Sequence, residues 1–316
     1  MMASRTTSQA IPKAPAFAAY VVVCLAVYWA PLWELLRLAL SVNTCSHILL
    51  IPFITIALVL TSPQRPGPDA RSSPGAAAAV FLTGIAVFGF SWRFGSWLSA
   101  GGALELIILS LVFLVWAGFL FLYGTQAFRS LLFPLLFLLF VVPLPQTLID
   151  RCIYWLQAGS SEVTYLLFRM TGTPVFRRGF VFFVPQFTIE VAQECSGIRS
   201  SVALVITCLL AGYLFLRSTW ARVALLLAAV PVLVIKNGVR IVTLTLLAIH
   251  VDPDFLSGNL HREGGFLFFV LGLLILWPVL WWLQKAEAKL MRPRTRTQGP
   301  VSGGSPAGPA AVLPQS

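Results

Sequence analysis

Three residues of the chain have the types that acyl transfer through a cysteine requires. Cys195 precedes an apolar segment, Arg240 interrupts a later one, and His261 precedes the last one. A thiolate attacks a peptide carbonyl, an imidazole moves protons, and a guanidinium stabilises the developing oxyanion. Each residue also has a structural reading, since a cysteine at a helix start is more often structural, a loop histidine is usually solvated, and an arginine near a span end can snorkel. The spacing alone does not bring the three side chains together.

The local sequence favours a reactive role for Cys195. The chain continues through Gly197 into an apolar helix, so the thiol would lie at a helix N-terminus, where the macrodipole favours the thiolate. Arg199 follows four residues later and would share its helical face, which favours the thiolate further. No Cys-x-x-Cys pair with zinc spacing occurs, and we expect no metal or other cofactor.

The elements that position these residues are membrane spans. Hydrophobic residues make up 58% of the chain and charged residues 10%, whereas a soluble domain carries roughly a quarter charged residues. The sequence therefore predicts an all-α polytopic membrane protein with about eight transmembrane helices, each of roughly 20 apolar residues or fewer. The seventh segment is long for one span and is interrupted between Lys236 and Arg240. The eight segments are 17–38, 47–62, 76–92, 103–123, 130–145, 198–216, 221–250 and 265–283.

Two smaller elements precede the sixth span. Apolar residues recur at helical spacing over 147–170 with charged residues between them, which predicts an amphipathic helix on the membrane surface. The stretch 175–191 alternates β-branched and aromatic residues, with a turn expected at Pro185-Gln186. This hairpin-like element leads directly to Cys195.

The distribution of Lys and Arg predicts the orientation. With a cytoplasmic N-terminus over 1–16, most basic connections face the cytoplasm, and Cys195, Arg240 and His261 all lie toward the extracytoplasmic side. We expect a transmembrane catalytic domain over 17–283 and a basic, disordered cytoplasmic tail over 284–316. The formal net charge of +11 comes largely from basic residues at the ends of the spans and in this tail, so nucleic acid is not an expected partner. Cys45 and Cys152 would both face outward, which leaves a disulfide between them open.

Three motifs resemble one known family. The string Glu190-Val191-Ala192-Gln193-Glu194-Cys195-Ser196-Gly197-Ile198-Arg199-Ser200-Ser201 looks like the cysteine motif of the exosortase/archaeosortase family. Asn237-Gly238-Val239-Arg240-Ile241 resembles that family's arginine motif, and His261 followed by Glu263-Gly264-Gly265 resembles its histidine motif. Ser46-His47 before an apolar helix is similar to its early Ser-His segment, and the motifs occur in the family's order.

The resemblance implies a membrane-embedded cysteine transpeptidase of the bacterial inner membrane. Its substrates would be exported proteins that end in a short motif of the Pro-Glu-Pro type, an apolar helix and a basic cluster. The enzyme would cut near the motif and transfer the protein to a surface acceptor, often in bacteria that produce exopolysaccharide. Carried over, Cys195 is the nucleophile, Arg240 binds substrate or oxyanion, and His261 transfers protons. Arg199, Asn237 and His47 are weaker assignments that would line the site.

The charge of the outer side suggests one contact with the substrate. An acidic residue of the sorting motif would pair with one of four arginines, namely Arg177, Arg178, Arg199 or Arg262. The alternative from another class is a transporter, or a non-catalytic assembly component of an exopolysaccharide system, because an interrupted seventh span suits an anion path. Rhomboid-like and zinc proteases are disfavoured because their Gly-x-Ser-x-Gly and His-Glu-x-x-His motifs do not occur.

Overall fold

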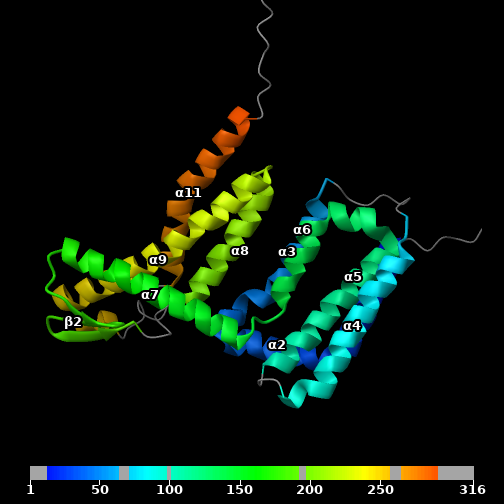
Figure 1. Cartoon of the computed structure of the whole chain (residues 1–316), viewed down its shortest axis with the longest axis horizontal. Coiled ribbons are helices and arrows are strands. Elements are labelled where there is room, and N and C mark those ends of the chain that lie inside the picture. The colour runs from blue at the N-terminus through cyan, green and yellow to red at the C-terminus, as the bar shows by residue number, and fades with distance from the viewer. Residues whose placement is uncertain (1–12, 64–70, 98–100, 192–196, 257–264, 291–316) are drawn as a thin grey trace, which may run out of the picture.

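The computed structural model describes residues 13–63, 71–97, 101–191, 197–256 and 265–290. This part of the chain is predominantly helical and carries one small sheet (Figure 1), as expected for an all-α membrane protein. The helices of the N-terminal half are α1 Lys13–Val27, α2 Trp29–Ser41, η1 Asn43–Leu49, α3 Ile51–Thr61, α4 Pro74–Phe94, η2 Gly95–Trp97, α5 Gly102–Ser130, α6 Leu132–Phe137 and η3 Leu138–Val141. The elements that follow are α7 Gln146–Met170, β1 Phe176–Arg178, β2 Val181–Val184, β3 Phe187–Glu190, α8 Ile198–Phe215, α9 Thr219–His250, η5 Pro253–Leu256 and α11 Gly265–Leu290.

The structure supports a multi-pass membrane protein but gives a smaller number of clear spans than the eight predicted. Among the described residues, 5 helices are long and apolar enough to cross a membrane, or up to 7 if each of two bent helix pairs is one span. The predicted second span shortens to α3, which has 11 residues. The predicted fifth span becomes the short helices α6 and η3.

Prolines explain both bent pairs. We predicted one helix over 17–38, but α1 and α2 meet at 78° around Tyr28. Pro31 lies in the first turn of α2, and its ring would clash with the carbonyl four residues earlier, on Val27, where α1 ends. The pair of α6–η3 and α7 bends by 94°, with Pro143 and Pro145 in the connection.

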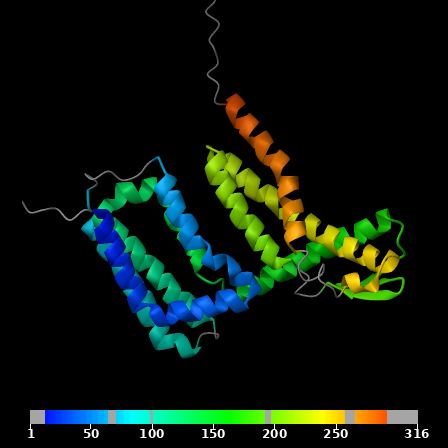
Figure 2. The same ribbon diagram turned by 180° about the vertical axis from the view of Figure 1, so that it is seen from behind.

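The helices form two groups that lie side by side (Figures 1 and 2). The first helix group contains α1 to α6, and the second contains α7, α8, α9 and α11 with the sheet. One apolar cluster joins them, because Ile206 of α8 packs with Ile51 of α3 and Phe137 of α6. The ring of Phe133 also stacks on that of Tyr213 with centroids 4.1 Å apart. The two groups thus share a continuous apolar contact.

The predicted hairpin-like element is a three-stranded antiparallel sheet in the order β1-β2-β3. Val184 pairs with Phe187, so β2 and β3 are joined by the two residues Pro185-Gln186, which confirms the predicted turn. The face carrying Phe182 packs against Phe168 of α7 and Val242 of α9. The sheet therefore fills the space between α7 and the second half of α9.

Two long helices differ from the expected segments. The interrupted seventh segment is a single continuous helix, α9, of 32 residues. α11 continues to Leu290, beyond the boundary at 283 where we expected the disordered tail to begin. Cys45 is buried and Cys152 is exposed, and the disulfide left open by the sequence is not formed between them.

Candidate active site

α7 and α9 approach closely through two glycines. A Cβ on Gly159 of α7 would lie 3.0 Å from the methyl carbons of Val234, and one on Gly238 of α9 would lie 2.6 Å from Cγ1 of Val163. Small residues let two helix backbones approach in this way. The contacts place the segment 236–240 of α9 against the middle of α7.

A glycine also begins α8 beside this segment. Gly197 has φ 68° and ψ 21°, which is the left-handed region that residues with a Cβ rarely adopt. A Cβ there would also lie 2.8 Å from Oδ1 of Asn237. The Gly197 carbonyl accepts hydrogen bonds from the Ser201 N–H at 2.9 Å and the Ser200 hydroxyl at 3.0 Å. The turn that follows the cysteine motif is thereby fixed against α9.

Polar side chains from three helices meet at this point. The Lys236 ammonium donates a hydrogen bond to Ser200 Oγ at 2.7 Å, which joins α9 to α8. Asn237 Nδ2 donates to Ser160 Oγ at 3.0 Å, which joins α9 to α7. Lys236 and Asn237 are each only 1% exposed. Arg240 lies one turn further along α9, is half-buried, and its positive charge repels that of Lys236.

Three more buried hydroxyls lie on the same helices, those of Ser161, Thr164 and Ser201. Within the part of the chain that the structure describes, none of these three oxygens has a hydrogen-bond partner. Each unpaired buried hydroxyl costs about 1–3 kcal/mol, so native proteins keep few of them. The contact between α7, α8 and α9 therefore contains buried polar groups that its hydrogen bonds do not satisfy. We call this set the polar seam; it consists of Ser160, Ser161, Thr164, Ser200, Ser201, Lys236 and Asn237.

The structure locates four of the six candidate residues. Arg240 and Asn237 belong to the segment 236–240 of α9, and Asn237 lies beside Gly197 at the start of α8. Arg199 is in the first turn of α8 and is exposed, and His47 is half-buried in η1, which packs against α8. Cys195 and His261 lie outside the described residues.

The chain next to these two residues is described. Cys195 comes two residues before Gly197, and His261 comes four residues before Gly265, where α11 begins. The starts of α8 and α11 lie toward the same end of the second helix group, close to α7 and the sheet (Figures 1 and 2). α11 packs over the polar seam, since a Cβ on Gly272 would lie 3.3 Å from Lys236 Cδ.

Comparison with known families agrees with these motifs. A family model described as transmembrane exosortase matches residues 39–278. The chain belongs to the transmembrane exosortase family. No curated protein and no solved structure matches it. The matched range includes the polar seam together with Cys195, Arg240 and His261.

Sequence reasoning missed most of the polar seam in this exosortase. From the sequence, Lys236 is an interruption of the seventh span that would suit an anion path, and the serines and threonine of α7 are part of an amphipathic surface helix. A signal was present, because Gln157, Ser160, Ser161 and Thr164 recur at helical spacing and mark one polar face. The structure shows that this face is turned toward α9 and is buried.

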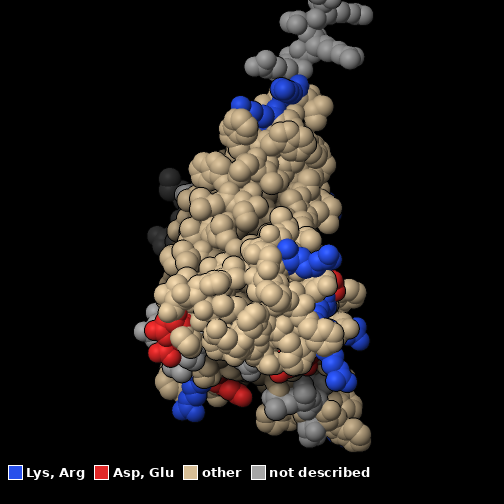
Figure 3. Space-filling model, turned by 90° about the vertical axis from the view of Figure 1, so that its left-hand side faces the viewer, with Lys and Arg blue, Asp and Glu red and all other residues tan. Residues whose placement is uncertain are grey.

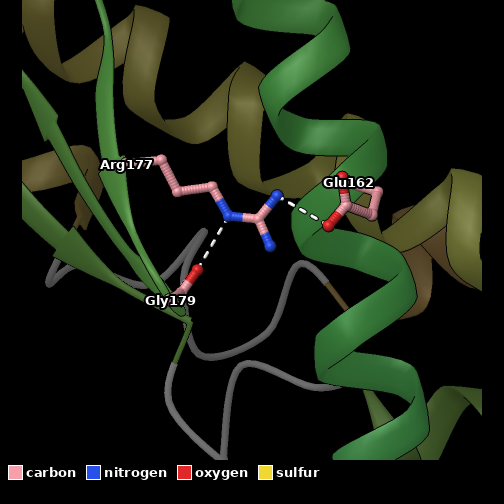
Figure 4. Close-up of polar contacts among 3 residues, drawn as sticks. All are labelled: Glu162, Arg177 and Gly179. Atoms are coloured by element: carbon pink, nitrogen blue, oxygen red, sulfur yellow. Dashed lines mark hydrogen bonds and ion pairs between the residues drawn. The ribbon is translucent and has the colours of Figure 1, made fainter.

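Arg177 is held by contacts within the protein (Figure 4). Its Nη1 lies 2.8 Å from Glu162 Oε1 on α7, and its Nε donates to the Gly179 carbonyl at 2.7 Å. Its guanidinium also lies over the ring of Phe182, 5.6 Å from the centroid. Arg177 therefore fastens the sheet to α7, whereas Arg178 and Arg199 are exposed.

Charged side chains on the surface of the second helix group lie in two separate regions. On the face shown in Figure 3, Lys and Arg occupy the upper tip, and charges of both signs occupy the lower part. The surface between them is uncharged, as expected of a protein face in the hydrocarbon core. The upper tip corresponds to the end of α11, with Lys285 and Lys289.

Proposed function

We propose that the chain is a membrane-embedded cysteine transpeptidase that cleaves the C-terminal sorting signal of exported proteins. The Cys195 thiolate would attack the carbonyl carbon of the scissile peptide bond, and the leaving amine would take a proton as the C–N bond breaks. The protein would then be held as a thioester on Cys195. A nucleophile of a surface acceptor would attack the thioester carbonyl and release the thiol.

One observation supports this proposal above the others. The turn that follows Cys195 packs against a buried segment of α9 that carries Lys236, Asn237 and Arg240. Ionisable residues inside membrane segments are costly and mark functional sites by default. Here Lys236 lies beside the first turn of an apolar helix, where a developing negative charge would be stabilised.

The remaining roles follow from the family motifs. Arg240 would stabilise the oxyanion or the substrate, and His261 would transfer protons. Arg199, Asn237 and His47 would line the site. A substrate with a single apolar tail would diffuse laterally in the bacterial inner membrane and present its motif on the extracytoplasmic side. An acidic residue of that motif would pair with one of the four arginines Arg177, Arg178, Arg199 and Arg262, and Arg177 would first have to leave Glu162, which its guanidinium contacts.

The decisive experiment replaces Cys195 with Ala and measures processing of a tailed substrate in cells. We expect complete loss of processing while the variant remains inserted at the normal level. Cys208→Ala is the matched control, because Cys208 is a buried thiol of α8 that lies about two turns beyond Ser201 of the seam. Full processing by Cys195→Ala would exclude the proposal.

The transporter alternative has lost part of its support. It relied on a broken seventh span, and α9 is continuous through Lys236 and Arg240. A transporter or assembly component would also tolerate Cys195→Ala, so the same experiment separates the two functions.

A further inference from the structure

One hydrogen bond of the polar seam joins an alcohol to an amine. Lys236 Nζ lies 2.7 Å from Ser200 Oγ, and the Ser200 hydroxyl donates to the Gly197 carbonyl at 3.0 Å. A hydroxyl hydrogen rotates about the C–O bond, so it can turn from this carbonyl to an unprotonated amine. An alcohol and an amine at hydrogen-bond distance are the parts of a serine–lysine dyad, in which the amine takes the proton as the oxygen attacks a carbonyl carbon.

The lysine side chain is enclosed between two helices at positions where each carries a glycine. Lys236 is buried, with its Cδ 3.3 Å from the position of a Cβ on Gly272 of α11. Its Nζ lies 3.6 Å from the position of a Cβ on Gly197 of α8. A lysine near the end of a span usually extends to the membrane surface. The amine of Lys236 is instead held inside the protein, next to the hydroxyl of Ser200.

In the described part of the chain, no carboxylate of the neighbouring helices pairs with this amine. α8 and α9 contain no Asp or Glu. Glu287 of α11 accepts a hydrogen bond from Ser218, and Asp150 and Glu162 of α7 are exposed. A buried ammonium costs free energy unless an opposite charge compensates it. Lys236 is therefore suited to hold a proton while a negative charge forms beside it, as a general base does during a reaction.

Ser200 is the accessible member of the pair. It is half-buried in the first turn of α8, whereas Lys236 is closed off from the surface. The first turn of a helix has N–H groups without acceptors inside the helix and carries the positive end of the macrodipole. Both would stabilise the negative charge that forms when a nucleophile at this position attacks a carbonyl group. The pair thus combines an accessible alcohol with a buried base.

We propose that Ser200 and Lys236 are a serine–lysine dyad, a second nucleophilic site that takes acyl groups from esters. Ser200 Oγ forms a bond to the ester carbonyl carbon as its proton passes to the Lys236 amine. The C–O bond to the leaving alcohol then breaks, and this alcohol takes the proton from the ammonium. Water attacks the acyl-serine and gives its proton to the amine. That proton returns to Ser200 Oγ as the carboxylic acid leaves.

The surroundings of the pair favour esters over peptides as substrates. The described contacts of Ser200 provide one proton carrier, the Lys236 amine, and an alcohol leaves with less help from an acid than an amine does. α8 is one of the helices long and apolar enough to cross a membrane, so an ester with an apolar acyl chain can reach it from the bilayer. The inference goes beyond the proposed function, because it does not require Cys195 to react.

The test measures hydrolysis of 4-nitrophenyl butyrate by the full-length Cys195→Ala protein in detergent, in which this thiol contributes nothing. We expect release of 4-nitrophenolate and, in samples quenched early, a butyryl group on Ser200 identified by peptide mass spectrometry. Ser200→Ala in the same background should lose both. Thr207→Ala is the matched control and should keep the rate, because Thr207 is a partly buried hydroxyl of α8 that bonds to the Ala203 carbonyl.

Two variants of Lys236 distinguish a base from a fixed charge. Lys236→Met removes the amine and should lower the rate by about 100-fold or more. Lys236→Arg keeps a positive charge but cannot give up its proton, so it should lose as much. A parental rate in Lys236→Arg would show that the side chain acts only through its charge, which would overturn the inference. Lys289→Met, at an exposed lysine near the end of α11, should keep the rate.

The position of the acyl group provides an independent decision. A butyryl group on Lys236 itself would make the lysine the nucleophile and overturn the dyad. Absence of the group from Ser200, in a protein that elutes as one species and melts cooperatively, would overturn it as well. Processing of a tailed substrate by Cys195→Ala decides the proposed function separately, because the ester assay uses neither that thiol nor that substrate.

Discussion

The two helix groups bury polar side chains in opposite ways. In the first group, the buried hydroxyl of Ser110 bonds to the Tyr28 hydroxyl at 2.8 Å and donates to the Ile107 carbonyl at 2.6 Å. Trp116 Nε1 donates to the Leu135 carbonyl at 3.1 Å. Among the described residues of this group, none of the buried polar side chains is charged.

The second group buries two charged side chains, Lys236 and Glu287, together with the hydroxyls of Ser161, Thr164 and Ser201. The Glu287 carboxylate accepts hydrogen bonds from Ser218, whereas the three hydroxyls have no hydrogen-bond partner among the described residues. The first group has one such hydroxyl, that of Thr55, and no buried charge among its described residues. Under the proposed function, the first group is a scaffold and the second keeps polar groups for chemistry, at a cost in stability.

The largest effect that tests this difference should come from Gly238→Val. The new side chain would meet Val163 Cγ1, 2.6 Å from the Cβ position, and separate α9 from α7. Overpacking of this kind costs about 1–3 kcal/mol. Displacement of Arg240 and Asn237 by about 1 Å should lower processing by about 100-fold. Processing of a reporter substrate, normalised to inserted protein, measures the effect. Normal processing would show that the α7–α9 contact does not position the site.

Gly84→Val is the corresponding change in the first group. A Cβ on Gly84 of α4 would lie 3.2 Å from Phe113 Cβ and 3.3 Å from the Ser110 carbonyl oxygen of α5. We expect a similar loss of stability, about 1–3 kcal/mol, seen as earlier melting in detergent. Processing per folded molecule should stay at the parent level. If it fell as far as in Gly238→Val, the division into scaffold and site would be wrong.

The sequence predicts the parts of the fold that depend on local pattern. Apolar length identifies α4, α5, α8, α9 and α11 as helices, and the alternation around Pro185-Gln186 identifies β2 and β3. The family motifs led to the correct family. These features depend on neighbours within a few residues, so the order of residue types is sufficient to reveal them.

The features that the sequence does not reveal depend on contacts between distant segments. Pro31 is compatible with either one kinked span or two separate helices, and the packing of the helices determines which of them forms. The place of Lys236 in the polar seam is visible only when its hydrogen bond to Ser200, 36 positions earlier, is known. Conversely, the arrangement of Cys195 and His261 relative to Arg240 remains a prediction from the motifs.

Glu287→Gln should have an intermediate effect that is confined to stability. The Glu287 carboxylate accepts hydrogen bonds from the Arg217 N–H at 3.1 Å, the Ser218 N–H at 2.6 Å and the Ser218 hydroxyl, and so fastens α11 to the start of α9. Loss of the charge should cost about 1.5 kcal/mol, as for a hydrogen bond to a charged group. Melting in detergent measures this loss, and processing at low temperature should remain normal. Abolished processing in a folded variant would place this end of α11 in the mechanism.

The smallest effect should come from the Arg177–Glu162 pair. Its Nη1–Oε1 distance is 2.8 Å, but the Glu162 side chain is 71% exposed, so the pair should contribute no more than about 1 kcal/mol. Arg177→Glu alone should loosen the sheet from α7 and lower processing slightly. The double variant Arg177→Glu with Glu162→Arg should restore it, because the pair is rebuilt with reversed charges. If the double variant instead processed substrate as poorly as Arg177→Glu, Arg177 would act on the substrate. The sheet would then belong to the recognition surface and not only to the support of α7.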